Sequence, residues 1–118
     1  MLKKQYFEKA LVWAKRNGVS NLKANFEDYE TPTTFSKEGE DSPYIPDITG
    51  SKNGNTSYLE IATKNGEVGR KVSKWKLLST LAAMKNGKLF LLAPKGHKAF
   101  AEKLVKEHDL NAEIVYLR

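Results

Sequence analysis

Two carboxylates, Asp47 and Glu60, flank the dipeptide Asn53-Gly54 in a stretch typical of a β-hairpin. Asn-Gly is favoured at the centre of a two-residue type I′ turn, and strand pairing runs outward symmetrically from such a turn. With this turn, residues whose numbers sum to 107 face each other, as 47 and 60 do. We therefore expect the two carboxylates side by side on one face of the hairpin, with Cβ atoms on the order of 5 Å apart.

Like charges at opposed positions of a sheet are unfavourable, so this pair needs a compensating partner. A divalent cation such as Mg²⁺ or Mn²⁺ is one candidate, because these ions are commonly held by one or two carboxylates while they keep waters for a phosphate substrate. Such an ion can activate water and stabilise the charge that develops on a phosphodiester. The alternative is a longer turn with a different register, which leaves both carboxylates pointing at solvent.

The elements that must position this pair follow from hydrophobic periodicity and from turn residues. Helical spacing predicts helices over 2–17, about 69–86 and 97–109. Strands are expected over 19–28, on both sides of the Asn-Gly turn within 44–63, over 89–93 and over 112–117. Residues 29–43 are rich in turn-forming and acidic residues and are expected to form a long loop. The sequence thus predicts one α/β domain over residues 1–118, in the order α-β-β-β-α-β-α-β.

Pro46-Asp47, a spacer across the turn, and Glu60 near the end of the next strand resemble motifs II and III of the PD-(D/E)xK nuclease superfamily, which includes restriction endonucleases and Holliday-junction resolvases. The order of elements is similar to that fold over nearly the whole chain. The resemblance implies a restriction endonuclease-like core, with a mixed central sheet flanked by helices. It also implies that Asp47 and Glu60 are ligands of Mg²⁺ or Mn²⁺. Glu8 in the first helix is the candidate for a further acid that many members carry there, or else an ordinary exposed helix residue.

One position departs from the family pattern, which places Lys two residues after the acid, where this chain has Ala62. Lys64 shares the face of Glu60 but lies about 13 Å away along an ideal strand, so a bulge is needed to bring it closer. Two other possibilities stay open. The following helix supplies the lysine from Lys71 or Lys74, or the lysine is lost and the domain only binds nucleic acid.

The net charge of +6 is concentrated in one segment. Residues 64–88 carry seven bases against the single acid Glu67, whereas residues 1–63 carry eight bases and nine acids. A localised basic segment is the electrostatic feature expected for a polyanion, although a solvated helix face is the alternative. We expect Arg70, Lys71, Lys74 and Lys76 to hold a nucleic-acid backbone, contacts that carry little sequence preference.

Composition limits the remaining possibilities. The 118 residues are 40% hydrophobic and 29% charged, which is ordinary for a globular domain. The chain lacks Cys and has no apolar run of roughly 20 residues, so disulfides and membrane spans are not expected and a cytoplasmic location is the default.

Trp75 is expected in the core, and His97 and His108 are expected in surface or capping positions.

The sequence therefore favours a metal-dependent endonuclease that hydrolyses DNA with little sequence specificity, acting as a dimer or within a larger assembly. The alternative is a catalytically inactive nuclease-fold module that binds nucleic acid or a protein partner.

Overall fold

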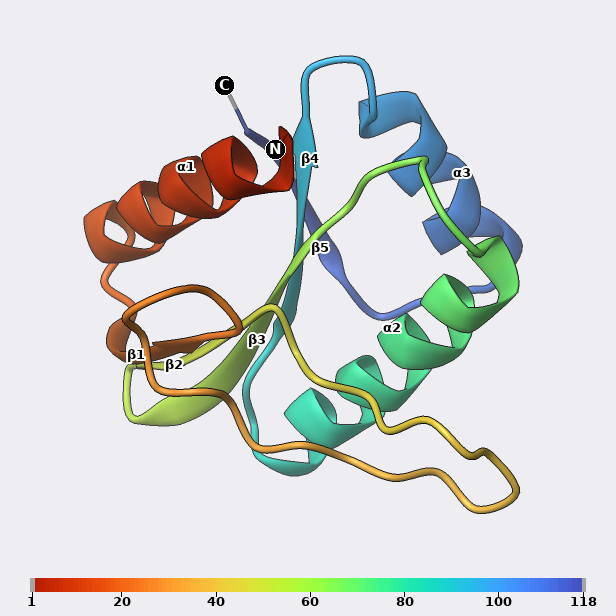
Figure 1. Ribbon diagram of the computed structural model, residues 1–118, viewed down its shortest axis with the longest axis horizontal. Coiled ribbons are helices and arrows are strands. Elements are labelled where there is room, and N and C mark those ends of the chain that lie inside the picture. The colour runs from red at the N-terminus through yellow and green to blue at the C-terminus, as the bar shows by residue number, and fades with distance from the viewer. Residues whose placement is uncertain (1, 118) are drawn as a thin grey trace.

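The fold is a five-stranded sheet with α1 on one face and α2 and α3 on the other (Figure 1). The computed structural model describes residues 2–117, with side chains from residue 4 on. Its elements are α1 (Leu2–Arg16), β1 (Ser20–Ala24), β2 (Ile48–Lys52), β3 (Asn55–Ile61), α2 (Val68–Met84), β4 (Leu89–Pro94), α3 (Lys98–Glu107) and β5 (Glu113–Leu117). The predicted α/β class and order of elements are confirmed.

The sheet is mixed and keeps its strands in chain order, β1-β2-β3-β4-β5. The first three strands form an antiparallel meander, whereas β3, β4 and β5 are parallel neighbours. Parallel neighbours need a crossover connection, and α2 and α3 supply the two crossovers. The chain thus divides into a hairpin half that carries the acidic pair and a crossover half that supplies the helix beside it.

The β2–β3 hairpin has the predicted two-residue turn. Asn53 and Gly54 both have positive φ, 54° and 81°, as a type I′ turn requires. Pairing runs from Lys52 opposite Asn55 to Ile48 opposite Leu59, so facing residues sum to 107 as expected. The register inferred from the sequence is confirmed, and it fixes which face of the sheet each side chain occupies.

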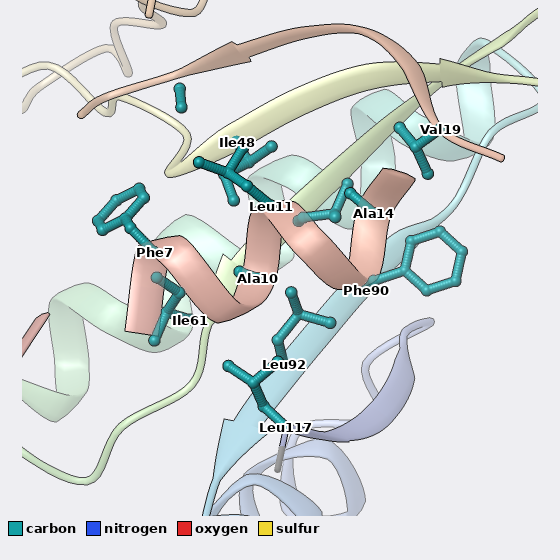
Figure 2. Close-up of a cluster of buried hydrophobic side chains, with 12 residues drawn as sticks. Phe7, Ala10, Leu11, Ala14, Val19, Ile48, Ile61, Phe90, Leu92 and Leu117 are labelled. Carbon is teal, nitrogen blue, oxygen red and sulfur yellow. The ribbon is translucent and has the colours of Figure 1, made fainter. Parts of the chain in front are cut away.

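Two hydrophobic cores lie on opposite faces of the sheet. The α1 core, shown in Figure 2, gathers apolar residues of α1 at helical spacing against alternate strand positions: Phe7, Ala10, Leu11, Ala14, Ile48, Ile61, Phe90 and Leu92. The second core joins α2 and α3 to the other face, and it buries Trp75 as expected. Leu59 and Ile61 of β3 belong to the first core, while Tyr58 of β3 and Ala62, which directly follows the strand, belong to the second. Glu60 therefore lies on the α2 face.

Strand β1 is shorter than the predicted 19–28, because the chain leaves the sheet after Ala24. Its pairing with β2 shifts by one residue between Ser20 and Lys23, and the extra residue there, Asn21, has a φ of 51°. This is a β-bulge. Gly50 makes room for it, since a Cβ at Gly50 would lie 2.4 Å from Cγ1 of Val19.

The turn between α2 and β4 packs directly on the start of β3. The Tyr58 amide donates to the Lys88 carbonyl oxygen at 2.9 Å. A Cβ on Gly87 would lie 1.5 Å from the Thr56 carbonyl oxygen, so this close approach requires glycine. The contact fixes the C-terminal end of α2 beside the hairpin. Within the described part of the chain, no helix is long and apolar enough to cross a membrane.

Candidate active site

Asp47 and Glu60 lie side by side, and each carboxylate accepts a hydrogen bond from a backbone amide across the hairpin. Oε2 of Glu60 accepts from the Asp47 amide at 2.7 Å, and Oδ2 of Asp47 accepts from the Ile61 amide at 2.9 Å. The two residues are only 4% and 2% exposed. The hairpin register therefore brings both carboxylates into one buried position, with one oxygen of each engaged by a backbone amide.

Lys74 of α2 faces the remaining carboxylate oxygens. Its Nζ lies 3.0 Å from Oε1 of Glu60 and 3.7 Å from Oδ1 of Asp47, and a fifth of its side chain is exposed. An ammonium at this position offsets the repulsion between the two carboxylates. Of the lysines left open by the sequence, Lys74 is the one that the structure places at the acidic pair.

Burial and charge shift the protonation of this cluster. Burial raises the pKa of Glu60 to about 7, and the neighbouring Asp47 carboxylate also acts to raise it, against the opposing effect of Lys74. Burial acts to lower the pKa of Lys74, but the two carboxylates outweigh it, so this pKa is raised above the usual 10.5. Lys74 is thus a cation at neutral pH, while Glu60 can exchange its proton there.

The cluster opens into a hollow of about 250 Å³ between the end of β3 and the start of α2. Its walls are the acidic pair with Ile61, the β3–α2 turn and the first turns of α2: Thr63, Asn65, Gly66, Glu67, Arg70, Lys71, Lys74 and Trp75. A small polar group from outside the protein can thus reach the buried carboxylates. Buried ionisable residues with shifted pKa values at an open hollow are typical of functional sites.

The donor atoms suit a hard divalent cation. Oδ1 of Asp47 and Oε1 of Glu60 face the Lys74 ammonium, and both residues line the hollow. Two carboxylates suffice for Mg²⁺ or Mn²⁺, which complete their coordination with water and substrate oxygens. The described residues contain no cluster of three or more His, Cys, Asp or Glu that could hold a metal. Asp47 and Glu60 thus fit Mg²⁺ or Mn²⁺, provided that the Lys74 ammonium moves aside.

The contacts of Lys64 and Lys71 involve the β3–α2 turn and its surroundings. Lys64 is exposed, and its backbone amide donates to Nδ1 of His97 at 2.9 Å, because β3 ends at Ile61 and the chain turns away. The Lys71 ammonium donates to the carbonyl oxygens of Thr63 and Asn65. Lys71 thus holds the β3–α2 turn that forms one wall of the hollow.

Arg70 binds the long loop between β1 and β2, which passes beneath α2 in Figure 1. Its guanidinium donates to the carbonyl oxygens of Pro43 at 2.6 Å and Ser42 at 3.3 Å. It also lies 3.7 Å from a Glu40 carboxylate oxygen and 4.1 Å from the centre of the Tyr44 ring. Arg70 therefore fixes the loop against the helix.

The four bases expected to hold a nucleic-acid backbone thus have different environments. Arg70, Lys71 and Lys74 are half-buried and make the intramolecular contacts described above. Lys76 is exposed on α2. The high charge of this segment therefore reflects the stabilisation of the site and its loop at least as much as a free basic surface.

Glu8 is exposed on α1 and lines a different hollow, together with Val12, Trp13 and Tyr116. Helix α1 covers the sheet face opposite the one that carries Glu60 (Figure 1). The structure therefore does not bring Glu8 to the acidic pair, and it has the environment of an ordinary exposed helix residue.

His97 has a role in the site region that its sequence position did not indicate. It is 9% exposed, and it directly precedes α3 without a side-chain cap to the helix. Burial lowers its pKa, and the positive charges of Lys64 and Lys71 lower it further. Neutral His97 can therefore accept a hydrogen bond from the Lys64 amide, and this bond holds the turn beside the hollow. A histidine before a helix carries no sequence signal for such a contact.

Comparison with known proteins found no matching family model, no matching curated protein and no matching solved structure. Function is therefore inferred from the geometry of the site.

Proposed function

We propose that this protein hydrolyses phosphodiester bonds of DNA with a divalent cation, Mg²⁺ or Mn²⁺, held by Asp47 and Glu60. The observation that carries the proposal is the position of Lys74, within 4 Å of both carboxylates at the wall of an open hollow. Lys74 supplies from α2 the ammonium group that Ala62, directly after β3, cannot supply.

The side chains have distinct roles in this proposal. Asp47 and Glu60 would hold the cation with the carboxylate oxygens that face Lys74, while their other oxygens accept from backbone amides that fix their orientation. When bound, the cation lowers the pKa of water and stabilises negative charge on the phosphate. Lys74 turns from the carboxylates toward a phosphate oxygen and stabilises the charge that develops there. Glu60 must be ionised to bind the cation, so protonation of this residue, whose pKa is raised to about 7 without metal, competes with cation binding.

The architecture supports the proposal at a coarser level. A mixed sheet with the order of elements found here resembles the core of the PD-(D/E)xK nuclease superfamily, with Asp47 directly before the second strand and Glu60 in the third. Fold alone does not determine function, so the resemblance adds weight only together with the Asp47, Glu60 and Lys74 cluster.

A second candidate function is a nuclease-fold module that binds nucleic acid without cleaving it. The observation in its favour is that Lys74 already compensates the acidic pair. In this reading the Lys74 ammonium balances the two carboxylates without a metal, and the sole role of the cluster is to fix α2 against the hairpin. The two candidates differ in whether the carboxylates exchange the ammonium for a cation.

Metal-dependent cleavage separates the candidates. End-labelled single-stranded, duplex and branched DNA are incubated with Mg²⁺ or Mn²⁺ and with wild type, Asp47→Asn, Glu60→Gln or Lys74→Met. Lys103→Met is the matched control, since this exposed lysine lies on α3, outside the segment expected to contact nucleic acid. We expect cleavage by wild type and the control, none by the carboxylate variants, and a reduction of roughly 10²–10³-fold for Lys74→Met. Salt-sensitive DNA binding without cleavage by wild type would support the inactive module instead.

A further inference from the structure

A second polar hollow lies near the hairpin turn, at the bulged edge of the sheet. Its volume is about 250 Å³. Two lysines, an asparagine and several hydroxyl groups line it, together with Gly50: Lys23, Lys85, Asn21, Thr33, Thr49, Ser51, Thr56 and Tyr58. None of these lining residues is an acid. Such a surface offers hydrogen-bond donors and positive charge to an anion.

This hollow opens on the same face of the sheet as the acidic pair. Thr56 and Tyr58 alternate with buried residues of the α1 core, so they share the face of Glu60. Ser51 pairs with Thr56 and Thr49 pairs with Tyr58, which places the β2 residues there too. Thr56 and Glu60 are four residue steps apart along β3, a span of about 13 Å at roughly 3.3 Å per residue.

Local backbone features build the hollow. The β1 bulge at Asn21, which Gly50 permits, shifts the pairing so that Lys23 lies opposite Thr49. β-Bulges commonly redirect side chains beside functional sites. On the other side, the Lys85 ammonium donates to the Tyr58 hydroxyl at 3.0 Å. This hydrogen bond holds the ammonium group over the hollow.

The two lysines remain available to a ligand. Lys85 is hydrogen-bonded to a neutral hydroxyl, so this contact does not cancel its charge. Lys23 forms an ion pair with Glu30 at 3.0 Å, but both side chains are about half exposed or more. Exposed pairs of this kind contribute at most about 1 kcal/mol, so a phosphate can displace Glu30. By contrast, Arg70 and Lys71 are held by backbone carbonyls near the acidic pair.

We propose that this second hollow binds a backbone phosphate of the DNA whose cleavage Asp47 and Glu60 promote, at a point about 13 Å along β3 from the acidic pair. The inference rests on the proposed function for the identity of the strand. Lys, Asn and hydroxyl side chains are the usual donors to DNA phosphates, and such contacts position a duplex without reading its sequence. The substrate class is thus a strand that continues beyond the cut toward this hollow.

Binding of a fluorescent 20-base-pair duplex, followed by anisotropy in EDTA over a range of salt concentrations, tests the hollow without any cleavage. The variant is Lys23→Gln/Lys85→Gln, and the matched control is Lys103→Gln/Lys106→Gln on the exposed side of α3. We expect the slope of log K against log salt to fall by about 0.9 for each DNA phosphate that the variant no longer neutralises. The control changes charge equally and should lower the slope less.

Backbone amide shifts in NMR spectra, recorded with the same duplex, locate the contact. We expect shifts at residues 21–23 and 56–58 and at Lys85. These shifts should weaken in Thr56→Val, which removes a hydroxyl while the lysines remain, and disappear in Lys23→Gln/Lys85→Gln. Shifts confined to 63–76, or a salt slope that falls no more in Lys23→Gln/Lys85→Gln than in the control, would overturn the inference even if the protein cleaves DNA. A reduced slope with shifts at the hollow, in a protein that never cleaves, supports the hollow and removes the proposed catalysis.

Discussion

Replacement of Lys74 by methionine tests the buried cluster at its centre. Methionine keeps an unbranched side chain but removes the ammonium that lies 3.0 Å from Glu60 and 3.7 Å from Asp47. The two carboxylates are then left in a buried position without that cation. The folded protein must either bring two like charges together or take up a proton.

The magnitude depends on pH. Removing one partner of a buried ion pair lowers the free energy of unfolding by roughly 3–5 kcal/mol. Because Lys74 is partly exposed, we expect the lower end of this range, about 3 kcal/mol, at pH 8. The pKa of Glu60 is already raised to about 7 and rises further without Lys74, so Glu60 is protonated at pH 5 in the variant. One negative charge then remains, and the cost falls to roughly 1.5 kcal/mol, the value of a charge-assisted hydrogen bond.

Urea unfolding at pH 5 and pH 8 measures both values. Lys76→Met is the control for the removal of an exposed ammonium from the same helix and is expected to change stability by less than about 0.5 kcal/mol. Adding Glu60→Gln to Lys74→Met should recover part of the stability at pH 8, because it removes one of the two like charges. A destabilisation below about 1 kcal/mol at pH 8, or a larger one at pH 5 than at pH 8, would refute this reasoning.

Three further predictions concern stability and the loop. Because the pKa of Glu60 is raised from 4.5 to about 7, the folded protein holds this proton more tightly than the unfolded chain. Stability relative to Glu60→Gln should therefore fall by on the order of 3 kcal/mol from pH 4 to pH 8 in unfolding titrations. Gly87→Ala should cost roughly 1–3 kcal/mol in thermal unfolding through its clash with a strand carbonyl, whereas Gly69→Ala in α2 should be neutral or stabilising. Arg70→Gln should speed proteolysis within residues 36–43 several-fold, because Arg70 fixes this loop, while destabilising the protein by about 1 kcal/mol or less. An unchanged rate of proteolysis in this loop would contradict the anchoring role of Arg70.

The hairpin and its acidic pair could be predicted because one local signal determines them. Asn53-Gly54 selects the turn type, the turn sets the register, and the register places Asp47 beside Glu60. Each step depends on short-range geometry with a period of two. The order of helices and strands could be predicted from the sequence for a similar reason, since each element has its own apolar periodicity.

The choice of lysine could not be made from the sequence. Lys71 and Lys74 are three positions apart on one helix, so both start near the same face. The β3–α2 turn supplies the backbone carbonyls that bind Lys71, and Lys74 then remains for the carboxylates. Charge counting likewise identified the basic segment but not the contacts of Arg70 with the loop, which depend on a long-range approach of two segments.

The most direct test of whether Asp47 and Glu60 form a divalent-metal site is titration calorimetry with Mn²⁺ at pH 8, where Glu60 is ionised. We predict one site per chain in wild type, retained in the control Asp41→Asn of the exposed loop and abolished in Asp47→Asn and Glu60→Gln. No binding by wild type, or binding that persists equally in Asp47→Asn and Glu60→Gln, would contradict the metal site and leave the cluster as a closed ion pair with Lys74.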